Sequence, residues 1–161
     1  MKGEKMKLGH LKNKIHAILG TENETEIRDE NLIIDSAQRK AALLGKFIIK
    51  TSSVPLYKRG ELDISALPSD FICAAGEKTY YAFPEQITEK TDDEVELGYD
   101  GDAADVTAYG AAMELCGRIY PADVRKYMRI ATEYDERMAA VCERNVKRVN
   151  NGVFGGRGIR R

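Results

Sequence analysis

The sequence predicts an α+β fold that is mostly α, with a helical core of about four helices and a small antiparallel β insertion in the middle. Apolar residues recur at spacings of three and four in four separate stretches, which is the period of an amphipathic helix. Between the second and third stretch, prolines, glycines and short aromatic runs replace that pattern, as in short strands joined by turns. Hydrophobic residues make up 43% of the 161 residues, enough for one domain with its own core.

Two helices are expected in the N-terminal part of the chain. The first covers residues 8–19, and Gly20 with the polar run after it ends that helix. The second begins near Ile27, and residues 47–49 either close it or open a strand. The apolar stripes are Leu8, Leu11, Ile15, Ile18 and Leu19 in the first helix, and Ile34, Ala37, Ala41, Leu44 and Ile48 in the second.

The middle of the chain, about residues 51–100, is expected to hold a small antiparallel sheet. Residues 71–75 and 79–83 form short apolar and aromatic runs, and Gly76-Glu77-Lys78 between them fits a hairpin connection. Leu67-Pro68-Ser69-Asp70 is a turn that leads into the first of these strands.

Two further helices are expected after the sheet. Asp102 is the predicted N-cap of the third helix, and Pro121 suits the first turn of the fourth. The short Gly/Pro break between them predicts antiparallel packing of their apolar stripes. These stripes are Val106, Tyr109, Met113 and Cys116 in the third helix, and Val124, Tyr127, Ala131, Tyr134, Met138 and Val141 in the fourth. The chain then divides into a lysine-rich helix and linker at 1–26, a domain at 27–146 and a basic, glycine-rich tail at 147–161.

No pattern of catalytic, cofactor-binding or metal-ligating residues is found. His10 and His16 are six residues apart and do not face each other on a helix. The three cysteines, Cys73, Cys116 and Cys142, form no C-x-x-C pair, so we interpret them as free thiols that act as small core residues. Gly152–Gly158 lacks the G-K-[ST] ending of a phosphate loop, and Asp100-Gly101-Asp102 lacks the residue order of a calcium loop. The sequence therefore predicts no enzyme, no metal and no cofactor.

The charges are unevenly distributed although the net charge is only −1. Residues 1–20 hold five lysines against one glutamate, and residues 144–161 are basic without any acidic residue. Residues 84–105, the acidic segment, hold nine carboxylates and one lysine. A chain that is acidic in the middle and basic at both ends can meet other copies head to tail, and such a contact makes a ring if it closes. A solvated acidic loop is the alternative interpretation.

The C-terminal tail is the candidate partner-binding segment. One interpretation is a flexible end, because its glycines disfavour a helix. The other is a segment that becomes ordered on a partner, with apolar side chains as anchors and arginines that make polar contacts. Its partner-binding residues would be Phe154, Arg157, Ile159, Arg160 and Arg161.

Several short motifs resemble the head–tail connector, or adaptor, proteins of tailed bacteriophages. Leu67-Pro68-Ser69-Asp70-Phe71 resembles an LPxDF segment of that family, and Tyr81-Ala82-Phe83-Pro84 and the acidic segment follow in the expected order. Residues 103–116 and 121–142 resemble its closing helical pair. The likeness covers roughly residues 28–146, and the helix at 8–19 has no counterpart in it.

The resemblance implies a non-enzymatic virion protein of the neck, assembled in the cytoplasm of the bacterial host. Its partners would be further copies of itself in a ring of about twelve, the portal protein, and a tail or second neck protein. DNA would pass through the ring without sequence-specific binding, and no membrane would be involved. The isolated subunit is expected to be monomeric or weakly associated and to form the ring mainly on its partner.

One alternative is a small nucleic-acid-binding or regulatory protein that uses its basic termini. The net charge and the lack of a recognition-helix or aromatic β signature weigh against it. Salt-dependent DNA binding would favour it.

Overall fold

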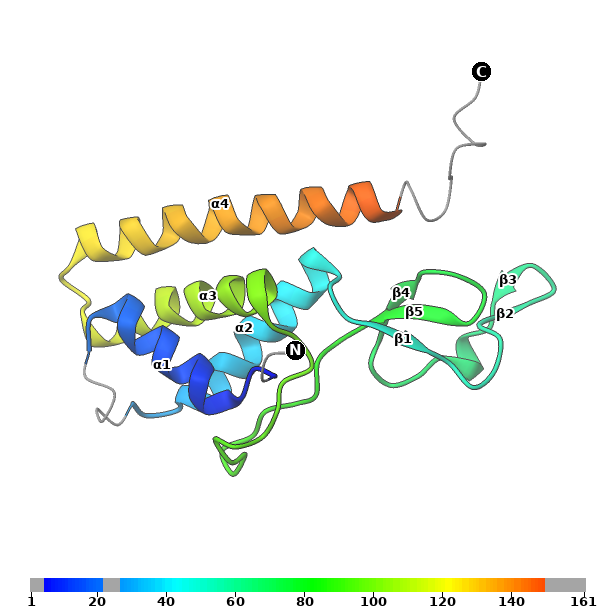
Figure 1. The fold of residues 1–161 in the computed structure, drawn as a ribbon, viewed down its shortest axis with the longest axis horizontal. Coiled ribbons are helices and arrows are strands. Elements are labelled where there is room, and N and C mark those ends of the chain that lie inside the picture. Colours follow the sequence, from blue (N-terminus) through cyan, green and yellow to red (C-terminus); the bar gives the residue numbers. More distant parts are fainter. Residues whose placement is uncertain (1–4, 22–26, 150–161) are drawn as a thin grey trace, which may run out of the picture.

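The computed structural model describes residues 5–21 and 27–149, with side chains up to Arg144. Within these residues lie four helices and, between the second and third, a small antiparallel sheet of three strands (Figure 1), which confirms the predicted fold class. In chain order the elements are α1 (Leu8–Leu19), α2 (Glu30–Gly45), β1 (Ile49–Thr51), β2 (Tyr57–Lys58), β3 (Glu61–Leu62), the 3₁₀ turn η1 (Ile64–Ala66), β4 (Phe71–Ala74), β5 (Thr79–Ala82), α3 (Gly101–Ile119) and α4 (Val124–Val149).

Helix α3 lies at the centre of the helical part and contacts α1, α2 and α4. Its small side chains allow these neighbours to approach closely, because an alanine face keeps two helix axes near each other. The fully buried residues on this face are Ala104, Ala108, Ala111, Ala112 and Leu115. The predicted stripe of α3 included none of these five residues.

Helix α1 has the predicted bounds and belongs to the same core as α3. Leu8, Leu11, Ile15 and Leu19 are fully buried. Gly20 ends the helix in the left-handed conformation, with φ 76°, and its N–H donates to a carbonyl of the last turn.

Helix α2 differs from its prediction at both ends. It begins at Glu30 instead of near Ile27, because Asp29 has a left-handed φ of 61°. It ends at Gly45, so Ile48 lies beyond it and the chain opens a strand at Ile49. The predicted stripe is wrong at Leu44, which is exposed, whereas Ile48 is buried in the core although it lies beyond the helix. The inward face is Ile33, Ile34, Gln38, Ala41, Ala42 and Gly45.

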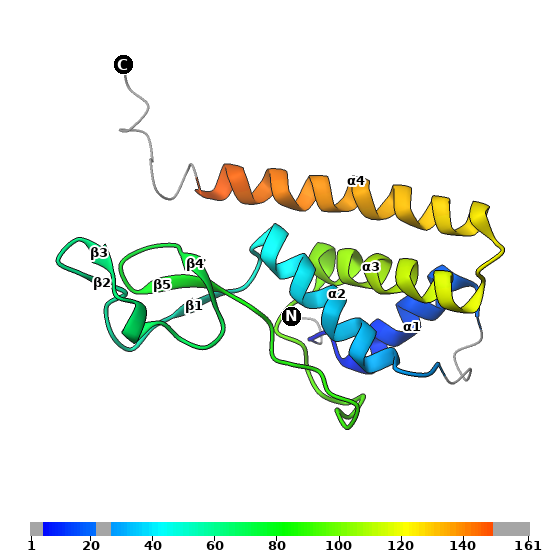
Figure 2. The same ribbon diagram turned by 180° about the vertical axis from the view of Figure 1, so that it is seen from behind.

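Helices α3 and α4 run antiparallel along each other (Figures 1 and 2), as the stripes predicted. One cluster between them contains Val106, Tyr134, Met138 and Val141, with Tyr109 and Met113 at its edge. Cys116 instead lies in the larger core with Ile130.

The N-terminal half of the predicted α4 stripe is wrong. Val124 and Tyr127 are 63% and 41% exposed. The first buried residue of α4 is Ile130, four places before Tyr134, whereas the prediction placed the half-buried Ala131 there. The N-cap of α3 was also misplaced by two residues: Asp100 is the cap, and Asp102 lies in the first turn.

Residues 49–82, which we call the β-lobe, project from one end of the helical part (Figures 1 and 2). The strand order is β1-β5-β4, and residues 75–78 connect β4 to β5 as predicted. A second hairpin, β2–β3, turns through Arg59 and Gly60, both with positive φ, as a two-residue hairpin turn requires. The sequence prediction did not include this hairpin.

Asp70 of the LPxDF segment ties the β-lobe together. Its carboxylate accepts hydrogen bonds from Lys50 Nζ (2.6 Å) on β1 and Tyr80 Oη (3.0 Å) on β5. Burial alone would raise the pKa of Asp70, but these two donors outweigh burial and lower that pKa. The resulting stabilisation is present above the ordinary carboxyl pKa and is lost as the pH falls through the lowered one.

Candidate interaction surfaces

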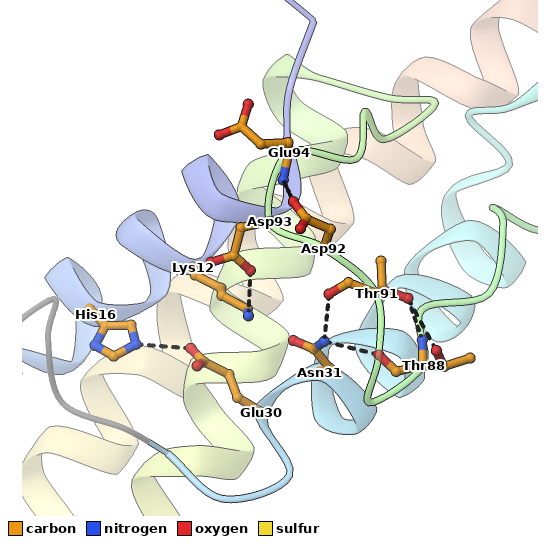
Figure 3. A network of polar contacts seen from close by, with 9 residues as sticks. All are labelled: Lys12, His16, Glu30, Asn31, Thr88, Thr91, Asp92, Asp93 and Glu94. Atoms are coloured by element: carbon orange, nitrogen blue, oxygen red, sulfur yellow. Dashed lines mark hydrogen bonds and ion pairs between the residues drawn. The ribbon is translucent and has the colours of Figure 1, made fainter.

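The acidic segment pairs with the lysines of the N-terminal region of the same chain. Lys12 Nζ lies 2.7 Å from Asp93 Oδ1 (Figure 3), and Lys7 Nζ lies 2.9 Å from Glu94 Oε2. Lys14 pairs with Asp105 at 2.8 Å, and Lys5 with Glu96 at 3.9 Å. Charges that the sequence analysis assigned to contacts between copies are thus paired within one chain. This pairing leaves less positive charge in the N-terminal region to bind the phosphate backbone of a nucleic acid.

The backbone of the acidic segment also caps α1. The N–H groups of Leu8 and Gly9 donate to the carbonyls of Val95 (3.0 Å) and Asp93 (2.8 Å). These N–H groups have no partner inside the helix, so the segment satisfies the start of α1. Gly9 allows the close approach, because a Cβ there would lie 3.2 Å from the Cβ of Asp93.

A row of polar side chains on α2 holds residues 85–91, the first part of the acidic segment. Asn31 Nδ2 donates to the carbonyls of Thr88 (2.9 Å) and Thr91 (3.3 Å), as Figure 3 shows. One turn further along α2, the Asp35 carboxylate accepts from the Ile87 N–H at 2.8 Å. The acidic segment is therefore fixed to the helical core by specific hydrogen bonds, although most of its charged side chains are exposed.

Gln38 completes this row and is fully buried. Its Nε2 donates to the Glu85 carbonyl (2.8 Å) and to Asp35 Oδ1 (3.1 Å), and its Oε1 accepts from Tyr99 Oη (2.7 Å). Burial raises the pKa of Tyr99, so its phenol stays protonated and keeps donating. A buried amide is stable only when such partners are present.

Replacing Gln38 with leucine is expected to lower the free energy of unfolding by about 2–4 kcal/mol, because the Tyr99 hydroxyl and the Glu85 carbonyl lose their buried partner. Amides of the acidic segment should exchange faster in the same variant. Urea unfolding and hydrogen exchange measure both effects. Gln86→Leu is the control, because Gln86 is exposed one residue beyond Glu85. Equal unfolding free energies for the two variants would contradict a structural role for Gln38.

The two histidines and three cysteines lie in different surroundings. His10 is exposed, whereas His16 is buried and lies 2.9 Å from Glu30 Oε1 and 3.0 Å from Thr21 Oγ1. Burial raises the pKa of Glu30, and the adjacent His16 opposes that shift. The three cysteines are free thiols, and burial raises the pKa of Cys116. Among the residues described, no group of three His, Cys, Asp or Glu side chains could hold a metal.

The partner-binding residues predicted from the sequence, Phe154, Arg157, Ile159, Arg160 and Arg161, lie outside the described residues. The structure adds two apolar surfaces that the sequence analysis did not identify. The β-lobe exposes five large apolar side chains and buries only Leu56, Tyr80, Tyr81 and Ala82. The exposed residues of this lobe surface are Ile49, Val54, Tyr57, Leu62 and Ile64.

The second apolar surface, the helix-end surface, lies where α3 ends and α4 begins. It consists of Ile119, Val124, Tyr127 and Met128, of which Val124 and Met128 are more than half exposed. This end of the helical part is opposite to the β-lobe (Figures 1 and 2). Apolar patches of this kind mark interaction sites more often than isolated exposed residues do.

Comparisons of the chain with protein families, curated proteins and solved structures find no match. No helix in the described part of the chain is both long and apolar enough to cross a lipid bilayer.

Proposed function

We propose that the chain is a structural virion protein, one subunit of a ring-shaped head–tail adaptor docked between the portal and the tail of a tailed bacteriophage. The β-lobe carries this proposal. A lobe that exposes five large apolar residues and buries only three large ones gains stability when a neighbouring subunit covers it.

The placement of the two apolar surfaces supports a ring over a two-fold dimer. The lobe surface and the helix-end surface differ in composition and lie at opposite ends of the molecule. Contact between two different surfaces of identical subunits is heterologous, and it closes into a ring when the rotation per subunit allows. The lobe of one subunit would therefore lie on the helix end of the next.

The resemblance to the adaptor family supports the remaining parts of the proposal. It implies that the partners are the portal and a tail or second neck protein, and that DNA passes through the lumen of the ring. The alternative is a nucleic-acid-binding or regulatory protein with basic termini. It has less support, because Lys7, Lys12 and Lys14 pair with acidic residues of the same chain.

Ile64→Asp is expected to abolish self-association at high protein concentration while leaving the melting temperature nearly unchanged. Ile64 is 80% exposed, so the folded monomer loses little, whereas a covered interface would have to bury an unpaired carboxylate. Sedimentation velocity over a concentration series measures the association. Leu43→Asp is the control, because Leu43 is 49% exposed on α2 and outside both apolar surfaces. If Ile64→Asp associates as the wild type does, the lobe is not the interface.

A further inference from the structure

A groove runs between the helical part and the β-lobe along residues 98–100. It has two adjoining compartments of about 410 and about 300 Å³, and Gly98, Tyr99 and Asp100 line both. Phe47 and Tyr99 form an aromatic floor, with ring centroids 5.3 Å apart in an edge-to-face arrangement. The space above Gly98 is open, since a Cβ there would meet no atom within 4 Å.

The groove has carboxylates without basic partners. Two of its acidic residues are paired: Glu96 with Lys5, and Asp102 with Arg144. Its remaining lysine, Lys50, is bound to Asp70 of the β-lobe. Among the residues whose side chains the structure describes, no basic group pairs with Glu85 or Asp100, so the groove carries two carboxylates without a basic partner there.

The C-terminal end of α4 lies at this groove. Val141 and Arg144 line its second compartment, and α4 ends at Val149. The chain then continues for twelve residues, 150–161, which carry three arginines, three large apolar residues and no acid. Asn150-Asn151-Gly152 comes first, and these residue types favour a reversal of the chain.

We infer that the groove is the binding site for this chain's own C-terminal segment, residues 150–161. Phe154 comes five residues after Val149, a reach of roughly 17 Å when extended, which is enough to return to the aromatic floor. Arg157, Arg160 and Arg161 follow three to seven residues after Phe154, and Asp100 and Glu85 line the same groove as the aromatic floor. Phe154 then packs on Phe47 and Tyr99, and the arginines supply the missing positive charge.

The segment of the same chain is preferred over that of a second copy because of its attachment point. A segment tethered beside its site has an effective concentration in the millimolar range, far above the protein concentration in dilute solution. This inference does not rest on the adaptor proposal. The same segment stays available to a portal or neighbouring subunit that binds it more tightly.

Nuclear magnetic resonance of the full chain tests the inference. In the wild type, {¹H}–¹⁵N NOE values of residues 153–161 should approach those of α4, and the Phe154 ring should show NOEs to Phe47 or Tyr99. Gly98→Leu fills the groove and should reduce the values to those of a free chain end. Gly117→Leu is its control, because Gly117 is equally open but lies on α3 away from the groove. Glu85→Lys should reduce the values in part, and Glu89→Lys, with the same charge change outside the groove, should not.

Three results would overturn the inference. Low NOE values in the wild type would show that the segment does not bind. Unchanged values in Gly98→Leu would place its binding site elsewhere. Contacts seen only between differently labelled chains in a mixed sample would assign the groove to a second copy.

Discussion

Replacing Met138 with aspartate is expected to lower the free energy of unfolding by about 3–5 kcal/mol. Met138 is 8% exposed in the cluster between α3 and α4, where it packs with Val106, Tyr134 and Val141. The substitution removes apolar contacts and places a carboxylate among apolar side chains. Chemical denaturation followed by far-UV circular dichroism measures the change.

Met128→Asp is the matched control for this prediction. It makes the same substitution in the same helix, but Met128 is 59% exposed and lies near the start of α4. A carboxylate near a helix N-terminus is slightly favourable, so the stability should change by less than about 0.5 kcal/mol. Similar losses in both variants would show that the inward face of α4 has been assigned wrongly.

Replacing Leu11 with alanine is expected to cost about 2–5 kcal/mol, the second large effect. Leu11 is fully buried on α1 and packs in the same core as the alanine face of α3. The α3 face that Leu11 packs with consists mainly of alanines, whose side chains are too short to fill the cavity. The same denaturation experiment measures this loss.

Leu32→Ala controls for the intrinsic effect of a leucine-to-alanine change in a helix. Leu32 is 42% exposed on α2, and its replacement should cost less than about 1 kcal/mol. If Leu11→Ala is no more destabilising than Leu32→Ala, then α1 is a loosely attached appendage. Helix α1 would then not belong to the core.

Turn residues made some elements predictable from the sequence. Gly20 marked the end of α1, and Gly76-Glu77-Lys78 marked the β4–β5 hairpin, because these residues allow conformations that end a helix or reverse a strand. The α3–α4 packing was predictable from Tyr134 and Met138, which are large and apolar at helical spacing.

Other features could not be predicted because their cause is tertiary. Because alanine is small, the alanine face of α3 does not stand out as an apolar stripe in the sequence, yet it lies at the centre of the core. Gln38 occupies a core position only because Tyr99, 61 residues later in the chain, supplies a hydrogen bond. Asp29 breaks the expected start of α2 through its positive φ, which no neighbouring residue signals.

The candidate surfaces were predicted less completely than the fold. Charge alone suggested contacts between copies, but the fold brings the acidic segment and the lysines of α1 together in one chain. The exposed residues Tyr57, Leu62 and Ile64 have the composition of a buried strand. Only the structure shows that the β-lobe has too few elements to cover them.

Negative-stain electron microscopy of the concentrated full-length protein tests the central claim, that this chain is a ring-forming structural subunit, most directly. The account predicts closed rings of one size at high concentration and mainly monomers on dilution, because neither apolar surface resembles an obligate interface. Ile64→Asp in parallel should give monomers throughout. Single particles at every concentration, or a two-fold dimer that persists in high salt and on dilution, would contradict the account.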